Sequence, residues 1–383
     1  MNFSLAQLAS DLTGLSPEEH GFSHLDLHSR PEGKGRLSGW VLSAKDLVDV
    51  AGMPTTFGAK ARTRMATTTD PFVAGLQKQG AHIVGKSATS ELGLRVDTEP
   101  AGLPHPVNPL FPGATPGGSS GGAAVQVARG LLRAAHASDG GGSIRVPAAA
   151  CGVVGFKPTG TGEPGRDLAV PGFITRTVAD AAFLHDITPC RPQARIGVLT
   201  DPLFAHTRVS PVMEHAVHEA AAKLRSAGFT LVPIKPYPHA SDTFTAFTHI
   251  FSSQLATLPA TEGYTEWIRQ MGLRVSQTQR RRARTHALGL PSLLAQWWGV
   301  DAILSPVTSD DPPPVGHFRS LSPATNFHAQ TRWTPWGSLF NVAHLPAISV
   351  PWNVPGRTPV GVHLGGITLN DAELLGLGQE LHP

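Results

Sequence analysis

The feature that most constrains the fold is a strand, a helix and a second strand in direct succession between residues 195 and 234. The segments "RIGVL" and "FTLVPI" are short apolar runs typical of buried strands. Between them, Ser210 and Pro211 are typical of a helix start and Gly228 of a helix end. One face of this helix would carry Val212, Ala216, Ala220 and Leu224. Strands joined in this way are parallel, so the pattern predicts an α/β fold whose parallel or mixed sheet is covered by helices.

A helix followed by a strand is also expected between residues 70 and 87. Asp70 is a suitable N-cap, Pro71 fits the first helical position, and "FVAGLQKQG" is followed by the apolar segment "AHIVGKS". With 383 residues, 40% of them hydrophobic, the chain can bury a large core. A turn-rich linker at 158–172 divides the chain, but no feature indicates that the two sides fold separately. We therefore expect a single domain spanning residues 1–383.

Charge and cysteine content exclude several classes of protein. The formal net charge is only +3, so a nucleic-acid partner is not expected, and the run "QRRRAR" at 279–284 is best explained as a solvated helix face. Cys151 and Cys190 cannot form a disulfide framework, which indicates a reducing compartment. No signal peptide or long apolar stretch is visible. We expect a cytoplasmic protein without a membrane span.

Two glycine-serine clusters lie between residues 117 and 149, in "GGSSGGAAVQVARGLLRAAHASDGGGSIRVPAA". A phosphate-binding Walker loop needs Lys and then Ser or Thr after its last glycine, whereas Ala123 and Ala124 follow here. Asp139 lies at the distance expected of a dinucleotide fingerprint, but the preceding "FPGATP" does not fit a strand. Nucleotide binding is therefore disfavoured.

The second cluster suits nucleophilic catalysis. Ser143 directly follows Gly140, Gly141 and Gly142, and a run of glycines lets successive backbone N–H groups converge on one point, as an oxyanion hole requires. A serine needs a base, and no histidine forms an evident triad motif nearby. Lys45 lies in the apolar stretch "SAKDLVDVAGMPTT", where desolvation would lower its pKa enough to provide a neutral amine.

These residues resemble the amidase signature family of serine hydrolases. The segment from Gly117 to Thr159 resembles the family signature, and "AKDLVDVAGMPTT" resembles its lysine motif. The likeness continues through "GFITRTVADAA", "DAILSPVT", "FNVAHLPAISVP" and "PVGVHLGG". The resemblance implies an α/β fold with a large mixed β-sheet covered by helices on both faces. It places the catalytic core at about residues 40–182 and a divergent, substrate-determining region at about 236–299.

The resemblance also implies a role for each candidate residue. Ser143 would be the acylated nucleophile, Ser119 the bridging serine after a cis peptide bond, and Lys45 the base. The backbone amides of Gly140, Gly141, Gly142 and Ser143 would form the oxyanion hole. Supporting roles fall to Ser120, Asp139 and Arg145. The implied substrate is a small-molecule amide, hydrolysed without a cofactor or metal by a monomer or homodimer.

Departures from the family pattern leave alternatives open. His344 replaces a usual glycine and Phe173 a usual proline. A stand-alone hydrolase ranks above an amidotransferase A-type subunit because no amino-acid-binding constellation is evident, and a non-catalytic scaffold is disfavoured because Lys45, Ser119 and Ser143 are all present. If Lys45 were not the base, His136 or His344 would be the next candidate.

The divergent region favours an apolar or aromatic acyl group in the substrate, since it is rich in aromatic residues: Phe244, Phe247, Phe251, Trp297 and Trp298. The three phenylalanines nevertheless have helical spacing, for which core packing is the more common explanation. The histidines at positions 20, 24 and 28 are spaced as on one helix face, but Gly21 interrupts that helix and a metal site is disfavoured. Cys151 is expected to be a buried small side chain.

Overall fold

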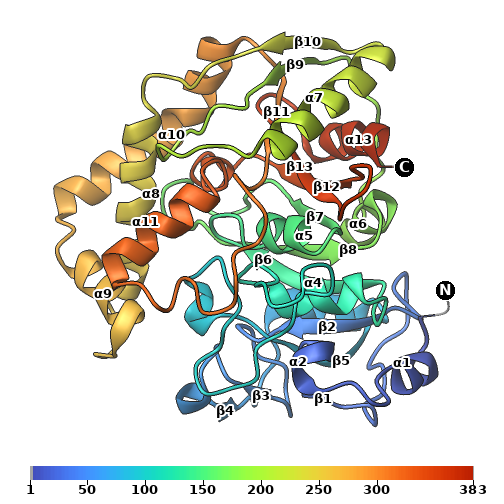
Figure 1. Cartoon of the computed structure of the whole chain (residues 1–383). Coiled ribbons are helices and arrows are strands. Elements are labelled where there is room, and N and C mark those ends of the chain that lie inside the picture. Colours follow the sequence, from blue (N-terminus) through green and yellow to red (C-terminus); the bar gives the residue numbers. More distant parts are fainter. Residues whose placement is uncertain (1–2, 383) are drawn as a thin grey trace.

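Eight strands form the large sheet of this computed structural model, which describes residues 3–382 (Figure 1). β9 pairs in parallel with both β10 and β11, whereas the other pairs are antiparallel, so the sheet is mixed as expected. The spatial order is β10 (Thr230–Pro233), β9 (Arg195–Val198), β11 (Ala302–Pro306), β13 (Val360–Gly366), β12 (Ala347–Trp352), β7 (Val154–Lys157), β8 (Val170–Thr175) and β6 (Ala134–Asp139).

A smaller sheet lies beside the β6 edge, below it in Figure 1. Its central strand β5 (His82–Ser87) pairs in parallel with β2 (Val41–Lys45) and antiparallel with β1 (Phe22–Leu25). The backbone N–H of Lys45, at the end of β2, donates to His136 Nδ1 of β6 at 3.2 Å, which joins the two sheets. A two-stranded ribbon of β3 (Pro54–Thr55) and β4 (Arg64–Met65) completes the strands of the described chain.

Helices cover both faces of the large sheet. The glycines of β13 mark one face: a Cβ on Gly361 would overlap Ala149 of α5 (Arg145–Ala150), and one on Gly365 would overlap Phe340 of α12 (Leu339–Val342). On the opposite face of the sheet, Ile348 of β12 packs against Gly378 of α13 (Asp371–Leu381). The absence of side chains therefore lets α5 and α12 approach the strands closely.

The two segments predicted from helix start and stop signals form as expected. The side chain of Asp70 accepts from the N–H groups of Phe72 and Val73 at the start of α3 (Pro71–Lys78), which leads into β5. Pro211 begins α7 (Pro211–Ser226), and Gly228 follows its end with a φ of +94° before β10. β9, α7 and β10 thus form the expected parallel unit.

The remaining helices lie before, between and after these strands. Together, α8, α9, α10 and α11 form a group at one side of the molecule (Figure 1). Their bounds are α1 (Leu5–Asp11), α2 (Pro17–His20), α4 (Gly121–Ala128), α6 (Val178–His185), α8 (Ala240–Leu255), α9 (Gly263–Leu273), α10 (Gln277–Trp298) and α11 (Pro323–Trp333), with short 3₁₀ turns at Lys60–Arg62 and Glu91–Gly93.

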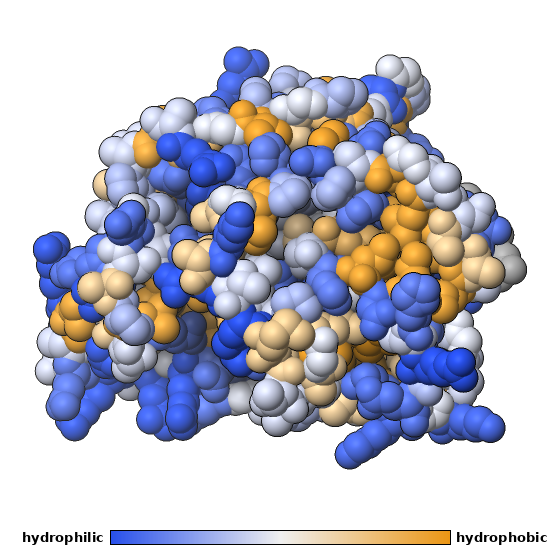
Figure 2. Space-filling view, turned by 90° about the horizontal axis from the view of Figure 1, so that it is seen from below, coloured by the Kyte–Doolittle hydropathy of each residue, from blue (hydrophilic) through white to orange (hydrophobic). Residues whose placement is uncertain are grey.

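The surface is mixed in character. Figure 2 shows mostly hydrophilic side chains on the face seen from below, with apolar side chains gathered toward the right. No helix within residues 3–382 has the length and apolar character needed to cross a bilayer.

Candidate active site

Lys45 is buried at the end of β2, with 1% of its surface exposed. Its Nζ lies 2.8 Å from Ser119 Oγ and 3.1 Å from both the hydroxyl and the carbonyl oxygen of Ser138. Burial lowers the pKa of Lys45 from its usual 10.5 to about 7, although the negative charge of Asp139 acts in the opposite direction. A substantial fraction of Lys45 is therefore neutral near neutral pH and able to accept a proton.

Ser119 is held at the turn that leads into α4. The peptide bond between Gly118 and Ser119 is cis. The hydroxyl of Thr98 bonds to Gly117 O at 2.8 Å and accepts from the N–H of Gly121 at 3.0 Å, so it fixes the chain on both sides of the serine. A Cβ on Gly118 would overlap the carbonyl of Asp97, so only glycine lets these two segments pack so closely.

Ser143 lies in the glycine turn between β6 and α5, and Asp139 organises this turn. Asp139 Oδ1 accepts from the N–H of Gly142 at 2.7 Å, and Oδ2 accepts from the N–H of Ile144 at 3.0 Å. The prediction that the Gly142 amide belongs to the oxyanion hole is therefore wrong in this geometry, because Asp139 already uses that donor. Among the described residues, the amides of Gly140, Gly141 and Ser143 have no hydrogen-bond partner, so they are available to an oxyanion.

A buried ion pair holds the turn against distant parts of the chain. The guanidinium of Arg145 binds both oxygens of Asp139, at 3.0 and 2.9 Å, and also donates to Gly337 O and Asn341 Oδ1 at 2.9 Å each. Burial by itself raises the pKa of Asp139, but the Arg145 charge and these hydrogen bonds bring the net value below the ordinary range. Asp139 is thus a permanent carboxylate that supports the loop.

Two cavities meet at Ser143, sharing Gly93, Leu94, Gly140 and Phe251 in their walls. The first is called here the aromatic arm because five aromatic rings line it: Phe244, Phe247, Phe251, Tyr264 and Phe327. The second is called the lysine arm and is lined by Lys45, Ser119, Ser138, Leu168 and Gln254 among others. The arrangement brings the three predicted catalytic side chains to one cavity.

The chain also matches a known protein family over most of its length. The family described as Amidase matches residues 23–194 and 190–375. The chain belongs to the amidase family. The Mycobacterium tuberculosis protein named "Putative amidase AmiB2" is 31% identical, and the match covers 90% of this chain and 81% of that protein. The indoleacetamide hydrolase of Pseudomonas savastanoi is 29% identical, and the match covers 88% of this chain and 82% of that protein. The 6-aminohexanoate cyclic dimer hydrolase shares the fold, with a TM-score of 0.86 at 24% identity over 98% of this chain and 92% of that one. This amidase is thus a hydrolase of carboxylic amide bonds.

The three phenylalanines of the divergent region both pack against the core and line a cavity. Phe244, Phe247 and Phe251 stack on one another along α8 and contact buried core clusters, as their helical spacing indicated. They also line the aromatic arm. Trp298 donates to the carbonyl of Lys235 and Trp297 is 55% exposed, and neither lines this arm.

The histidines and the departures from the family pattern lie outside both arms. His136 accepts from the backbone of Lys45, and burial lowers its pKa to about 3, so its ring is neutral. His344 stands at a φ of +54° and its Nε2 contacts Asp167 O at 2.7 Å, which ties down the 158–172 linker. Phe173 is fully buried beside His136 in the core.

Four residues that the sequence did not single out contact the surroundings of the serines. Thr98 contacts the turn of Ser119, Ser138 contacts Lys45, Asn341 contacts Asp139, and His363 contacts Arg145. A signal for Ser138 existed, because strand alternation in "AAHASD" places it on the same face as His136, and both contact Lys45. Ser120, predicted as supporting, donates its backbone N–H to Ser143 O at 3.3 Å. No local pattern indicated Thr98, whose role depends on a distant turn.

The remaining candidates take no part in the two arms. Within residues 3–382, no group of three or more His, Cys, Asp or Glu side chains is arranged to hold a metal, and His20 instead accepts from the N–H of Phe22. Cys151 is buried and burial raises the pKa of its thiol, whereas Cys190 is exposed; both are free.

Proposed function

We propose that this amidase works through an acyl-enzyme on Ser143, with Ser119 and Lys45 as a proton relay. The observation that carries the proposal is the 2.8 Å contact between Lys45 Nζ and Ser119 Oγ in a cavity that Ser143 also lines. Neutral Lys45 accepts the proton of Ser119, which in turn accepts that of Ser143 as Ser143 Oγ attacks the carbonyl carbon. The amides of Gly140, Gly141 and Ser143 stabilise the oxyanion.

The second half of the reaction returns the proton. As the tetrahedral intermediate collapses, Ser119 gives its proton to the leaving nitrogen and is reprotonated by Lys45. The amine leaves and water takes its place. The same relay then deprotonates the water, which attacks the acyl carbon and releases the acid with Ser143 restored. The relay therefore ends each cycle in its starting protonation state.

The two arms have different parts in this scheme. The leaving nitrogen must lie beside Ser119, so the amine portion occupies the lysine arm and the acyl portion the aromatic arm. Stacked rings favour an apolar or aromatic acyl group. The name of the related indoleacetamide hydrolase, whose substrate has an aromatic acyl group, supports the same substrate class.

A serine-directed fluorophosphonate tests the mechanism. Intact-mass measurement is expected to show one adduct on the wild-type enzyme and none on Ser143→Ala. Labelling that persists in Ser143→Ala would show that another residue is the nucleophile. In parallel, aryl acetamides are expected to give a higher kcat/KM than glutamine; the reverse order would reject the apolar acyl group.

We further propose a stand-alone cytoplasmic enzyme, a monomer or homodimer, instead of an amidotransferase subunit. The free cysteines Cys151 and Cys190 support a reducing compartment. Purification from native cells is expected to yield the chain without a second polypeptide and with hydrolysis that does not need ammonia. Copurification of a partner together with ammonia-dependent product would favour the amidotransferase alternative.

A further inference from the structure

The aromatic arm has a wall that separates it from a second, larger space. Arg95 and Tyr264 line the aromatic arm, and both also line a larger outer groove. Within the described chain, neither residue lines the lysine arm. The groove has polar sides that carry the ion pairs Arg62–Glu91 at 2.8 Å and Arg319–Glu99 at 3.8 Å. Two side chains therefore divide an apolar cavity from a polar one.

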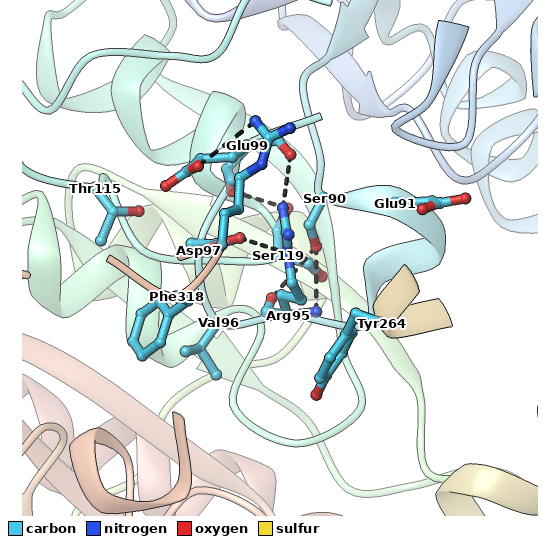
Figure 3. A network of polar contacts seen from close by, with 12 residues as sticks. Ser90, Glu91, Arg95, Val96, Asp97, Glu99, Thr115, Ser119, Tyr264 and Phe318 are labelled. Carbon is cyan, nitrogen blue, oxygen red and sulfur yellow. Dashed lines mark hydrogen bonds and ion pairs between the residues drawn. The ribbon is translucent and has the colours of Figure 1, made fainter. Parts of the chain in front are cut away.

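Arg95 is placed in this wall by contacts within its own segment of the chain. Its Nε lies 2.9 Å from Asp97 Oδ1, and its Nη2 donates to Glu99 O at 2.7 Å. The backbone N–H of Arg95 also contacts Ser90 Oγ at 3.4 Å. Figure 3 shows Arg95 among Ser90, Asp97 and Glu99, with Tyr264 near by. Because Asp97 is fully buried, the arginine cannot swing away without leaving a carboxylate unpaired.

Tyr264 is fixed by a second set of contacts. Its hydroxyl accepts from Gln330 Nε2 at 3.1 Å, and Gln330 Oε1 accepts from the N–H of Val96 at 2.8 Å. The Tyr264 ring stacks on Trp267 with 6.1 Å between centroids. The hydrogen-bond chain joins Tyr264 on α9 to the segment that carries Arg95, so the two wall residues are positioned together.

We propose that Arg95 and Tyr264 set the maximum length of the acyl group that this amidase hydrolyses, by closing the aromatic arm against the outer groove. This inference rests on the proposed function, in which the acyl group occupies the aromatic arm. An acyl chain that fits within the arm buries fully against the phenylalanines. A longer chain meets the wall and must bend back or displace it, so its transition state is less well bound.

The test is a series of straight-chain acyl p-nitroanilides from acetyl to hexadecanoyl. For the wild type, kcat/KM is expected to rise with each methylene and then to fall once the chain reaches the wall. In Tyr264→Ala and in the double variant Arg95→Ala with Asp97→Asn, the fall is expected to move to longer chains. Each methylene that is added within the apolar aromatic arm is expected to raise kcat/KM by up to about fourfold.

The double variant removes the carboxylate charge together with its cation, so that neither is left buried alone. If it fails to fold, Tyr264→Ala still tests the wall from the other side. Tyr264→Phe keeps the ring and is expected to keep the wild-type length limit. Arg319→Ala removes an arginine that lines only the groove and is likewise expected to leave the limit unmoved.

The possible failures are distinguishable. If the wall variants hydrolyse the anilides with the wild-type length limit, the inference is overturned while the proposed function stands. If Arg319→Ala moves the limit as far as the wall variants do, a general loosening of the groove is responsible and the wall is rejected. If the wild type hydrolyses none of the series and takes up no fluorophosphonate, the proposed function is overturned and this inference with it.

Discussion

Lys45 and Lys157 are both fully buried lysines whose pKa burial lowers to about 7, yet only one lies beside the serines. Lys45 contacts Ser119 in the lysine arm, whereas Lys157 Nζ donates to Pro158 O at 2.8 Å and lines neither arm. A lowered pKa is therefore not sufficient to identify a base. The position of each lysine relative to Ser119 and Ser143 makes the distinction.

This pair gives a controlled test of the base. In the wild type, kcat/KM for an anilide is expected to rise with pH through about 7 and then level off, because neutral Lys45 accepts the proton. Lys45→Ala is expected to lose this limb and most activity. Lys157→Met is expected to keep the rise of kcat/KM with pH. If that rise disappears in Lys157→Met, the group that titrates is Lys157 and not Lys45.

His344 adopts a left-handed backbone conformation, with a φ of +54°, that favours glycine. Its Nε2 contact with Asp167 O compensates by anchoring the linker that carries Leu168, a residue of the lysine arm. We expect His344→Ala to lose the contact with Asp167 and to keep the backbone strain. His344→Gly loses the same contact but relieves the strain. The glycine variant should be more stable than the alanine variant by about 1 kcal/mol in urea unfolding. Equal stabilities would mean that the backbone relaxes around residue 344.

At the scale of elements, replacing a glycine by alanine is expected to change stability in opposite directions on a helix surface and where a strand packs against a helix. A Cβ on Gly289, exposed within α10, meets no atom of the described structure within 4 Å apart from its own helix backbone. Gly289→Ala is expected to stabilise the protein by about 0.5–1 kcal/mol. Gly361→Ala places a methyl group on Ala149 of α5 and is expected to destabilise it by about 1–3 kcal/mol. Thermal unfolding of both variants beside the wild type checks the two signs; a stabilised Gly361→Ala would show that α5 can move away from the sheet.

The elements that the sequence predicted best have their signals within a few residues. Asp70 with Pro71 and Pro211 with Gly228 mark helix ends that hydrogen bonds and fixed φ values determine locally. The order of strands in the large sheet depends on contacts between distant segments, and no local signal predicted it. Ser119, Ser143 and Lys45 could be proposed as the catalytic residues because their motifs are long and specific. The lining of the aromatic arm was only partly predictable. The aromatic residues of the divergent region indicated an apolar substrate group, but helical spacing shows which residues share a face and not what that face contacts.

The Gly142 amide shows that even a specific motif does not predict every contact of its residues. Glycine spacing predicted a set of converging N–H groups, and three of the four remain available. The fourth is bound to Asp139, three residues earlier, because the turn brings that carboxylate back over the chain. The glycines make the backbone of the turn conformationally free, but the geometry of the turn decides which N–H groups remain available to a ligand.

For the whole molecule, buried lysines make stability depend on pH. Lys157 has a pKa of about 7 when folded and near 10.5 when unfolded, so the unfolded state binds more protons between these values. The free energy of unfolding should therefore rise with pH in that window, by up to about 1.4 kcal/mol per pH unit for each such lysine. Urea unfolding of wild type and Lys157→Met at several pH values is expected to show a smaller slope in the variant.

The comparison with Lys157→Met is needed because other buried groups act in the opposite direction. Burial raises the pKa of Cys151, Tyr237 and Tyr264, which stay protonated in the folded state and lower its stability as the pH becomes strongly alkaline. These contributions are the same in both proteins and cancel in the difference. A difference that does not change between pH 7 and 9 would show that Lys157 is protonated in the folded state.

The buried pair of Asp139 and Arg145 has a consequence for the order in which the protein is made. Its partners Gly337, Asn341 and His363 lie 192 to 218 positions further along the chain. During translation, Ser143 therefore leaves the ribosome long before the residues that complete the surroundings of its turn have been synthesised. We expect stalled nascent chains that end before Gly337 to take up no fluorophosphonate, while released full-length chains do. Such a result would mean that Ser143 stays unreactive during translation until the last strands have been synthesised.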